Sequence, residues 1–117
     1  MPGRNDRAAP PPPEGGYTLR FLRKNAAEGW EMLCQQAPGP MLVAYEQLSM
    51  RPLDPVNHDR QHRLKFDLEY VQVGKALLEQ WQYEVTGAGR IWYGVNSSTT
   101  TVWISHAAPG HPRRTGR

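Results

Sequence analysis

The sequence predicts an α+β domain in which a two-helix hairpin packs on a twisted antiparallel β-sheet. The first observation is the alternation of apolar and polar residues around Trp81, after Arg90 and around Ile104, which is typical of three successive strands. The second is an upstream stretch with apolar residues at helical spacing, divided by the corner at 38–40, which predicts two short helices. One strand, two helices and then three or four strands is an α+β order.

The elements before residue 52 follow from local signals. Tyr17 to Phe21 alternates and is the predicted first strand. Asn25 stands before an apolar helical stripe with Glu28 three residues later, so we expect Asn25 to cap the first helix. The second helix is expected to end before Pro52. Four side chains of this region are predicted to pack in the core: Trp30, Cys34, Tyr45 and Met50.

Strands are predicted for most of the remaining chain. Leu64, Phe66 and Leu68 alternate with Arg63, Lys65 and Asp67, which indicates a strand with a polar, partly basic face. Turns are expected at 74–75, 87–89 and 96–98, where glycine, asparagine and serine gather. This arrangement puts Arg90 at the start of a central strand and Tyr93 inside. In the last strand, His106 is expected on the side of Val102 and Ile104, opposite Trp103 and Ser105.

The 117-residue chain is expected to hold one domain. We divide it into a disordered proline-rich segment (1–16), a folded domain (17–112) and a basic, flexible tail (113–117). The net charge of +3 comes from the tail, since the folded unit has nine Lys or Arg and nine Asp or Glu. An anionic partner would therefore have to be recognised by local clustering of cations.

Composition also excludes several classes of site. The single cysteine, Cys34, rules out an internal disulfide framework and a cysteine-rich zinc site. His58 and His62 are four residues apart, but no acidic residue at useful spacing completes a metal site. The sequence shows no secretory signal and no apolar run of membrane-spanning length. We therefore expect a soluble cytoplasmic protein without membrane contact, metal or cofactor.

The residues that could carry chemistry are cationic or aromatic. Arg90, His106 and His111 accompany the last three strands, and the densest cationic stretch is the one around His62, Arg63 and Lys65. Arginine, lysine and histidine suit anionic substrates, above all phosphodiesters. Each also has an ordinary interpretation: Arg90 as an exposed strand residue paired with Glu84, and the histidines and basic stretch as solvated surface.

Five segments of the sequence together indicate a protein family more specifically than any one of them does alone. They are Arg63–Lys65, Leu78–Val85, Arg90–Val95, Val102–Ile104 and Gly110–Pro112. In this order they resemble the RelE/ParE toxin superfamily, and more narrowly the RelE-like proteins of high-GC Gram-positive (actinobacterial) species. The resemblance covers residues 17–112.

The resemblance implies a toxin of a type II toxin–antitoxin system. RelE-like members cut mRNA on the ribosome without metal: the 2′-hydroxyl attacks the adjacent phosphate and leaves a 2′,3′-cyclic phosphate and a 5′-hydroxyl. Arg90 would then stabilise the transition-state phosphate, Lys65 with Arg63 would clamp phosphate or assist the attacking hydroxyl, and His111 would be the general acid. The remaining RNA contacts would be His62, His106, Arg113 and Arg114.

The partners implied are a cognate antitoxin, the ribosome and mRNA. Two alternatives remain at this level. One is a ParE-like toxin that binds gyrase, and the other is a non-catalytic interaction protein with the RelE fold.

Overall fold

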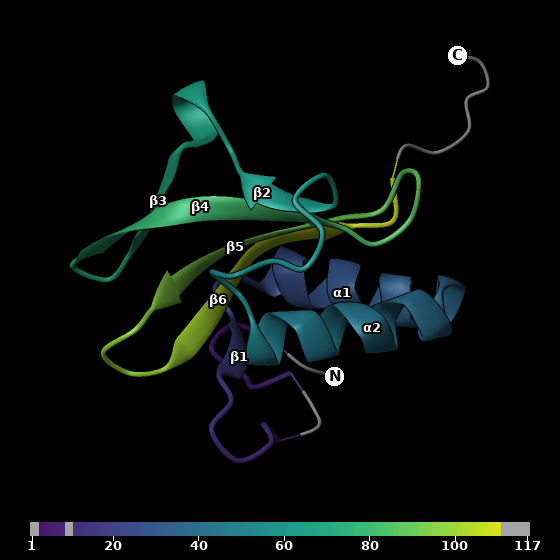
Figure 1. Ribbon diagram of the computed structural model, residues 1–117, viewed down its shortest axis with the longest axis horizontal. Coiled ribbons are helices and arrows are strands. Elements are labelled where there is room, and N and C mark those ends of the chain that lie inside the picture. Colours follow the sequence, from purple (N-terminus) through teal and green to yellow (C-terminus); the bar gives the residue numbers. More distant parts are fainter. Residues whose placement is uncertain (1–2, 9–10, 111–117) are drawn as a thin grey trace.

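The computed structural model describes residues 3–8 and 11–110. Two α-helices cover one side of a six-stranded sheet, and the opposite side, which we call the open face, carries no α-helix among the described residues (Figure 1). The strands are β1 (Thr18–Phe21), β2 (Gln61–Arg63), β3 (Tyr70–Val73), β4 (Ala76–Glu84), β5 (Arg90–Asn96) and β6 (Thr101–Ala108). The helices are α1 (Lys24–Gln36), α2 (Pro38–Met50) and the short η1 (Phe66–Leu68).

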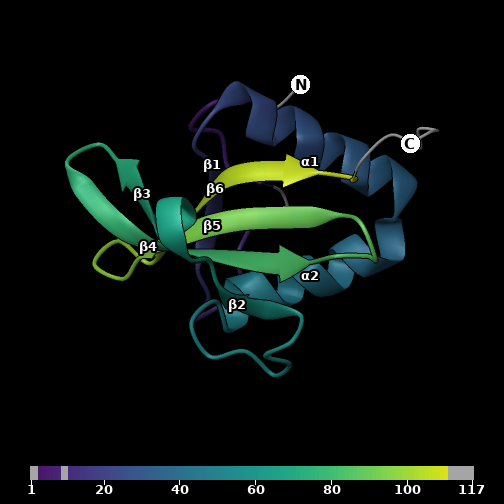
Figure 2. The same ribbon diagram turned by 90° about the horizontal axis from the view of Figure 1, so that it is seen from above.

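The strand order is β1-β6-β5-β4-β2, and β3 pairs with the first half of β4 (Figure 2). The predicted α+β class and helix hairpin on a sheet are confirmed, and β4, β5 and β6 form the predicted antiparallel meander. The sheet is mixed, however, because β1 pairs with β6 in parallel. The two helices after β1 lead the chain to the opposite edge of the sheet, where β2 pairs with β4, and the meander then returns it to β1.

The α1 helix lies on the sheet through a stripe of buried residues at helical spacing: Ala26, Ala27, Gly29, Trp30 and Leu33. It begins at Lys24, with Arg23 in extended conformation as its N-cap, so the prediction of Asn25 as the cap is wrong. No side chain caps the helix at this end. Gly29 is needed for close packing, because a Cβ there would lie 1.7 Å from the Ala107 carbonyl oxygen of β6.

The α2 helix follows after a single residue, Ala37, and has a proline in its first turn, where no intrahelical donor is lost. Tyr45 packs in the core, as predicted, together with Trp30 of α1. The prediction for Met50 is wrong, since its side chain is 49% exposed. Position 50 lies two residues beyond buried Leu48, which turns it roughly 200° away from the buried stripe.

The predicted strand from Leu64 to Leu68 is not formed. Only Gln61 to Arg63 pair with β4, and the chain then leaves the sheet edge as η1 before returning as β3. Phe66, at the start of η1, has a φ of 59° and is 89% exposed. This excursion interrupts what would be one long edge strand, and such interruptions protect sheet edges from pairing with other chains.

Part of the N-terminal segment that we predicted to be disordered instead lies along β1. The Asn5 and Ala8 amides donate to the Phe21 and Leu19 carbonyls, and the Phe21 amide donates to Asp6. Ala8 is 2% exposed in the core. The segment supplies backbone partners for the outer edge of β1, which hydropathy alone does not reveal. The proposed division of the chain into three segments remains a prediction.

Candidate functional site

The open face of the sheet carries one cross-strand row of polar and aromatic side chains. His62 pairs with Gln82 of β4, Gln82 pairs with Trp92 of β5, and Trp92 pairs with His106 of β6. The flanking residues of these strands, including Tyr83, Ile91 and Tyr93, are buried against the helices. Alternation along each strand therefore turns the whole row away from the helices, so that both histidines share the open face.

The centre of the row is a contact between Trp92 and His106, whose ring centroids are 4.5 Å apart. The Trp92 indole also donates to Gln82 Oε1 at 2.9 Å, which fixes the orientation of the ring. Burial lowers the pKa of His106, and the positive charge of Arg23 lowers it further. His106 is thus held toward its neutral form, which can accept a proton.

The position of His106 corrects the sequence prediction, which put it on the side of Val102 and Ile104. The register of β5 and β6 shifts between Trp92 and Tyr93, so that Trp92 pairs with His106 while Tyr93 pairs with Ile104. Ser105 is the extra residue of this β-bulge, and its buried hydroxyl donates to Gln80 Oε1. A bulge reverses the alternation of side chains beyond it, which brings His106 to the open face.

Arg90 lies in the next row of the same face, at the start of β5. Its Nη1 donates to the Thr86 and Gly89 carbonyls at 3.0 Å each. Its Nη2 lies 3.9 Å from Glu84 Oε1, so the predicted pairing of Arg90 with Glu84 across the hairpin is present. The other carboxylate oxygen of Glu84 lies 3.7 Å from His62 Nε2. The two hydrogen bonds to backbone carbonyls hold the guanidinium of Arg90 in place. Its Nη2 faces the Glu84 carboxylate, which another anion could replace.

Within the predicted basic stretch, Arg63 is neutralised by acids. Arg63 Nη1 lies 3.3 Å from Glu79, its Nη2 lies 3.8 Å from Glu69, and its guanidinium lies over the Tyr70 ring at 5.6 Å. Arg63 also donates to the carbonyls of Gln80 and Glu69. These bonds indicate that Arg63 ties β2 to the β3–β4 hairpin.

The structure does not bring Lys65 to Arg90. The Leu64 amide donates to the Gln80 carbonyl, whereas Arg90 pairs with Glu84, four residues further along β4. Four strand residues correspond to about 13 Å along the sheet, with about 10 Å more across two strand spacings. Lys65, which is exposed, lines a shallow surface with Arg63, Phe66 and Glu69.

His111, Arg113 and Arg114 lie outside the described residues. The chain that leads to them is described as far as Gly110, and it ends beside Arg90. Ala108 pairs with Arg90, and a Cβ on Gly110 would lie 2.4 Å from Ala88 Cβ in the β4–β5 turn. Gly110, the last described residue, thus lies at the end of the sheet where Arg90 begins β5.

Within residues 3–8 and 11–110, no group of three histidine, cysteine, aspartate or glutamate side chains is placed to hold a metal ion. None of the helices in this part of the chain is long and apolar enough to cross a membrane.

Sequence reasoning missed Trp92, Gln82 and Arg23 as members of this surface. The alternation around Arg90 already placed Trp92 opposite Tyr93, and the same pattern could have grouped it with Gln82. Arg23 could not be found this way, because it reaches the site from the β1–α1 corner and donates to the Ser105 carbonyl at 2.7 Å.

Three comparisons with known proteins place these observations in context. No protein-family model matches the chain, and the search of curated proteins gives no match. Among solved structures, the chain is similar to one in the crystal structure of the RelBE2 toxin–antitoxin complex from Mycobacterium tuberculosis. The likeness covers 83% of this chain and 99% of that one, with 22% sequence identity and a TM-score of 0.49.

Proposed function

We propose that the protein is a RelE-like toxin of a type II toxin–antitoxin system that cleaves mRNA on the ribosome without a metal ion. The sequence resemblance supports this proposal, and one structural observation carries it. Arg90 and His62 lie on the open face of the sheet on either side of the Glu84 carboxylate, and His106 lies on the same face, on the strand next to that of Arg90. An arginine and two histidines on one accessible face suit a phosphodiester better than a neutral substrate.

In this proposal Arg90 binds the scissile phosphate and stabilises the charge that develops on it. The phosphate would displace Glu84 from Nη2 while the two backbone carbonyls keep the guanidinium in place. His106, with its lowered pKa, is suited to accept the proton of the attacking 2′-hydroxyl. His111 would protonate the leaving 5′-oxygen, and Trp92 would offer an aromatic surface to a neighbouring base.

Lys65 takes a different role from the one expected of it. Its distance along β4 from Arg90 is too large for both to hold one phosphate, so Lys65 would contact a flanking nucleotide. The tail arginines Arg113 and Arg114 would add non-specific attraction to the RNA backbone.

The test is inducible expression of the wild type and of Arg90→Ala, His106→Ala and His111→Ala, with growth and transcript ends measured together. We expect the wild type to arrest growth and to leave 2′,3′-cyclic phosphate and 5′-hydroxyl ends, and each variant to lose most of this cleavage. Arg51→Gln is the matched control, because Arg51 pairs only locally with Asp54 in an exposed ion pair. Thermal unfolding of each purified variant separates lost chemistry from lost folding.

Other outcomes favour the alternatives. A DNA-damage response without transcript cleavage would identify a gyrase-binding toxin. Normal growth on strong expression would identify a non-catalytic interaction protein. We further propose that a cognate antitoxin covers the open face, in which case co-expression of the product of the adjacent open reading frame would restore growth.

A further inference from the structure

A second cationic surface lies where the β1–α1 corner meets the N-terminal segment and the β3–β4 hairpin. It forms a hollow of about 460 Å³ lined by Arg4, Leu22, Arg23, Lys24, Gln72 and Gly74. Arg4, Arg23 and Lys24 are exposed. Arg20 lies close by, since its Nη1 donates to the Asn5 carbonyl next to Arg4. We call this surface the corner groove.

The cations of the corner groove are poorly neutralised. Among the described residues, no carboxylate lies within ion-pair distance of Arg4, Arg20 or Arg23. Lys24 has only a 4.0 Å contact with Glu28, between two exposed side chains. Arg63, by contrast, has two glutamates beside it. Three of the four cations at the corner groove therefore have no ion pair within the described chain, whereas Arg63 has two.

The start of α1 adds to this positive charge. The first turn of α1 has no acidic residue and no capping side chain, and cations occupy its N-cap and first position. The backbone N–H groups of a first turn carry partial positive charge, so Arg23 and Lys24 are placed unfavourably unless an anion lies nearby. Such an arrangement is stabilised by a bound phosphate.

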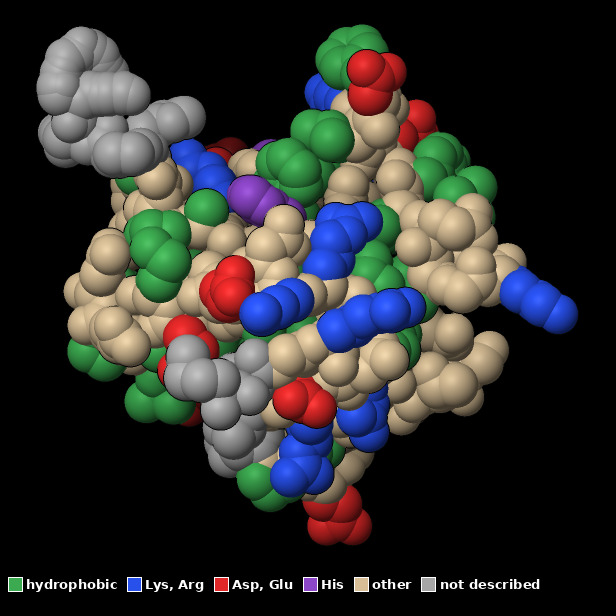
Figure 3. Space-filling view, turned by 180° about the vertical axis from the view of Figure 1, so that it is seen from behind, with side chains coloured by type: hydrophobic (Ala, Val, Ile, Leu, Met, Phe, Trp, Pro, Cys, Tyr) green, Lys and Arg blue, Asp and Glu red, His purple; other side chains and the backbone are tan. Residues whose placement is uncertain are grey.

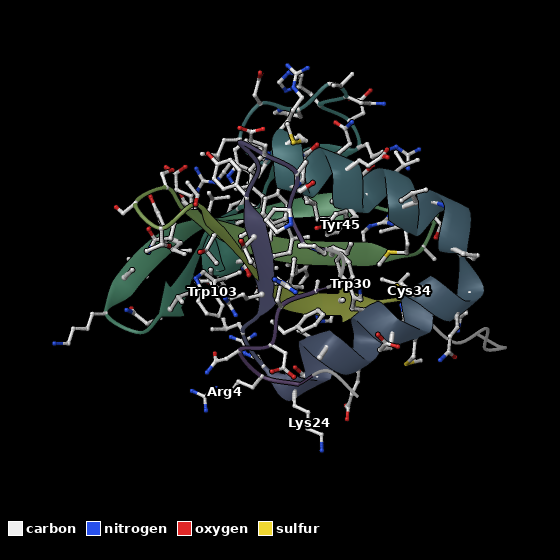
Figure 4. The ribbon with its side chains drawn as sticks, turned by 90° about the horizontal axis from the view of Figure 1, so that it is seen from below. Arg4, Lys24, Trp30, Cys34, Tyr45 and Trp103 are labelled. Atoms are coloured by element: carbon white, nitrogen blue, oxygen red, sulfur yellow. The ribbon has the colours of Figure 1, made fainter. Side chains whose placement is uncertain are left out.

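The corner groove is continuous with the proposed cleavage site. Arg23 donates to the Ser105 carbonyl, one residue before His106, and its charge lowers the pKa of that histidine. Trp103 of β6 pairs with Arg20 of β1 and is partly exposed. Figure 3 shows Lys and Arg side chains close together over the centre of this side of the molecule. Arg4 and Lys24 point outward into solvent (Figure 4).

We propose that the corner groove binds the backbone phosphates of single-stranded RNA that continues from the Arg90–His106 site, an inference that rests on the proposed function. Cations that follow a groove beside an aromatic side chain form the usual surface for single-stranded nucleic acid. Trp103 supplies a stacking surface that an acidic protein segment would not require. The RNA thus passes over β6 toward β1, away from Lys65.

The test measures binding of a non-cleavable 2′-O-methyl RNA oligonucleotide by fluorescence anisotropy at several salt concentrations. The double variant Arg4→Gln/Lys24→Gln removes two exposed side chains that hold no other element in place. Each phosphate contact to a single strand contributes about 0.7 to the slope of log K against log salt, so the slope should fall by about 1.4. Arg51→Gln is the control for charge and is expected to leave the slope unchanged.

An unchanged slope in the double variant would overturn the proposal, as would a wild type that does not bind the oligonucleotide. A poly-glutamate competitor gives a second arm: if its affinity depends on Arg4 and Lys24 while that of RNA does not, the corner groove is a protein-binding site and the proposal fails. Because the probe cannot be cleaved, weaker binding by the double variant supports the corner groove even if the wild type cuts no transcript.

Discussion

Trp92 and His106 lie on neighbouring strands with their ring centroids 4.5 Å apart and their planes tilted by 43°. The contact depends on the bulge at Ser105, without which His106 would face the helices. Burial of the imidazole, followed by the charge of Arg23, lowers its pKa. One extra residue in one strand thus determines whether the open face has a proton acceptor beside Arg90.

We expect Trp92→Ala to raise the pKa of His106 toward its ordinary value, because water regains access to the imidazolium. Arg23→Gln should raise it as well, since the second cause of the shift is the charge of Arg23. Titration of the imidazole protons by NMR measures both effects. Trp81→Phe is the control, because Trp81 stacks on Tyr93 and lies on the helix side. An unchanged pKa in both variants would show that neither burial nor Arg23 acts on His106.

The lowered pKa also predicts a pH dependence of stability. Below the ordinary histidine pKa of 6.5 the unfolded chain binds a proton that folded His106 does not yet bind. The free energy of unfolding should therefore fall as the pH drops from 6.5 to the folded pKa, and then level off for this group. Denaturant titrations at several pH values should show this fall in the wild type and a smaller one in His106→Gln.

Tyr93 is predicted to contribute to stability through its hydroxyl group. The hydroxyl donates to the Pro52 carbonyl at 2.7 Å and accepts from Gln61 Nε2 at 2.9 Å, all in a buried site. Tyr93→Phe leaves both partners short of a bond and should cost about 1–3 kcal/mol of unfolding free energy. Tyr83→Phe is the control, because that hydroxyl has no comparable pair of bonds within the described chain. Equal losses in the two variants would contradict the special role of Tyr93.

The packing of α1 on β6 predicts opposite effects on stability for two glycine substitutions. Gly29→Ala would place a methyl group 1.7 Å from the Ala107 carbonyl oxygen, so α1 must move off the sheet. We expect a loss of about 3 kcal/mol or more, or failure to fold, since overpacking against backbone cannot be relieved by a rotamer change. Gly39→Ala in α2 meets nothing within 4 Å and should be neutral or stabilising by up to about 1 kcal/mol. Thermal unfolding of the two variants compares them directly.

How far the sequence predicts this molecule depends on the range of the interaction concerned. Alternation along strands and helical stripes identified the meander, the two helices and the buried Tyr93, because these patterns are local. Alternation predicted the wrong face for His106, because a bulge depends on how two strands pair. It failed for Phe66 because edge position decides whether an alternating segment joins the sheet.

The candidate site was only half predictable for the same reason. Arg90, its partner Glu84 and the open-face position of His62 follow from strand register, which turns and alternation define. The neutralisation of Arg63 by Glu69 and Glu79 depends on how the β3–β4 hairpin folds back beside β2. The corner groove joins residues from the N-terminal segment, the β1–α1 corner and this hairpin, and no sequence spacing relates them.

The last prediction concerns Glu84, which lies near both Arg90 and His62 on the open face. As a carboxylate, Glu84 competes with a phosphate for Arg90 Nη2. Glu84→Gln removes this competition together with one negative charge on the open face, so we expect the non-cleavable RNA oligonucleotide to bind more tightly. Arg90→Gln should have the opposite effect.

The control for Glu84→Gln is Glu46→Gln, which makes the same change of charge on exposed α2, on the helix side of the sheet. If general electrostatic attraction alone acts, the two variants should show the same increase in affinity for RNA. Both increases would then disappear at high salt. If Glu84 competes locally with the phosphate, Glu84→Gln should raise the affinity for RNA more than Glu46→Gln does, and this increase should depend on Arg90. The double variant Glu84→Gln/Arg90→Gln separates the two explanations: if it still gains as much as Glu84→Gln does alone, Glu84 does not act through Arg90, and the assignment of Arg90 as the phosphate-binding residue is wrong.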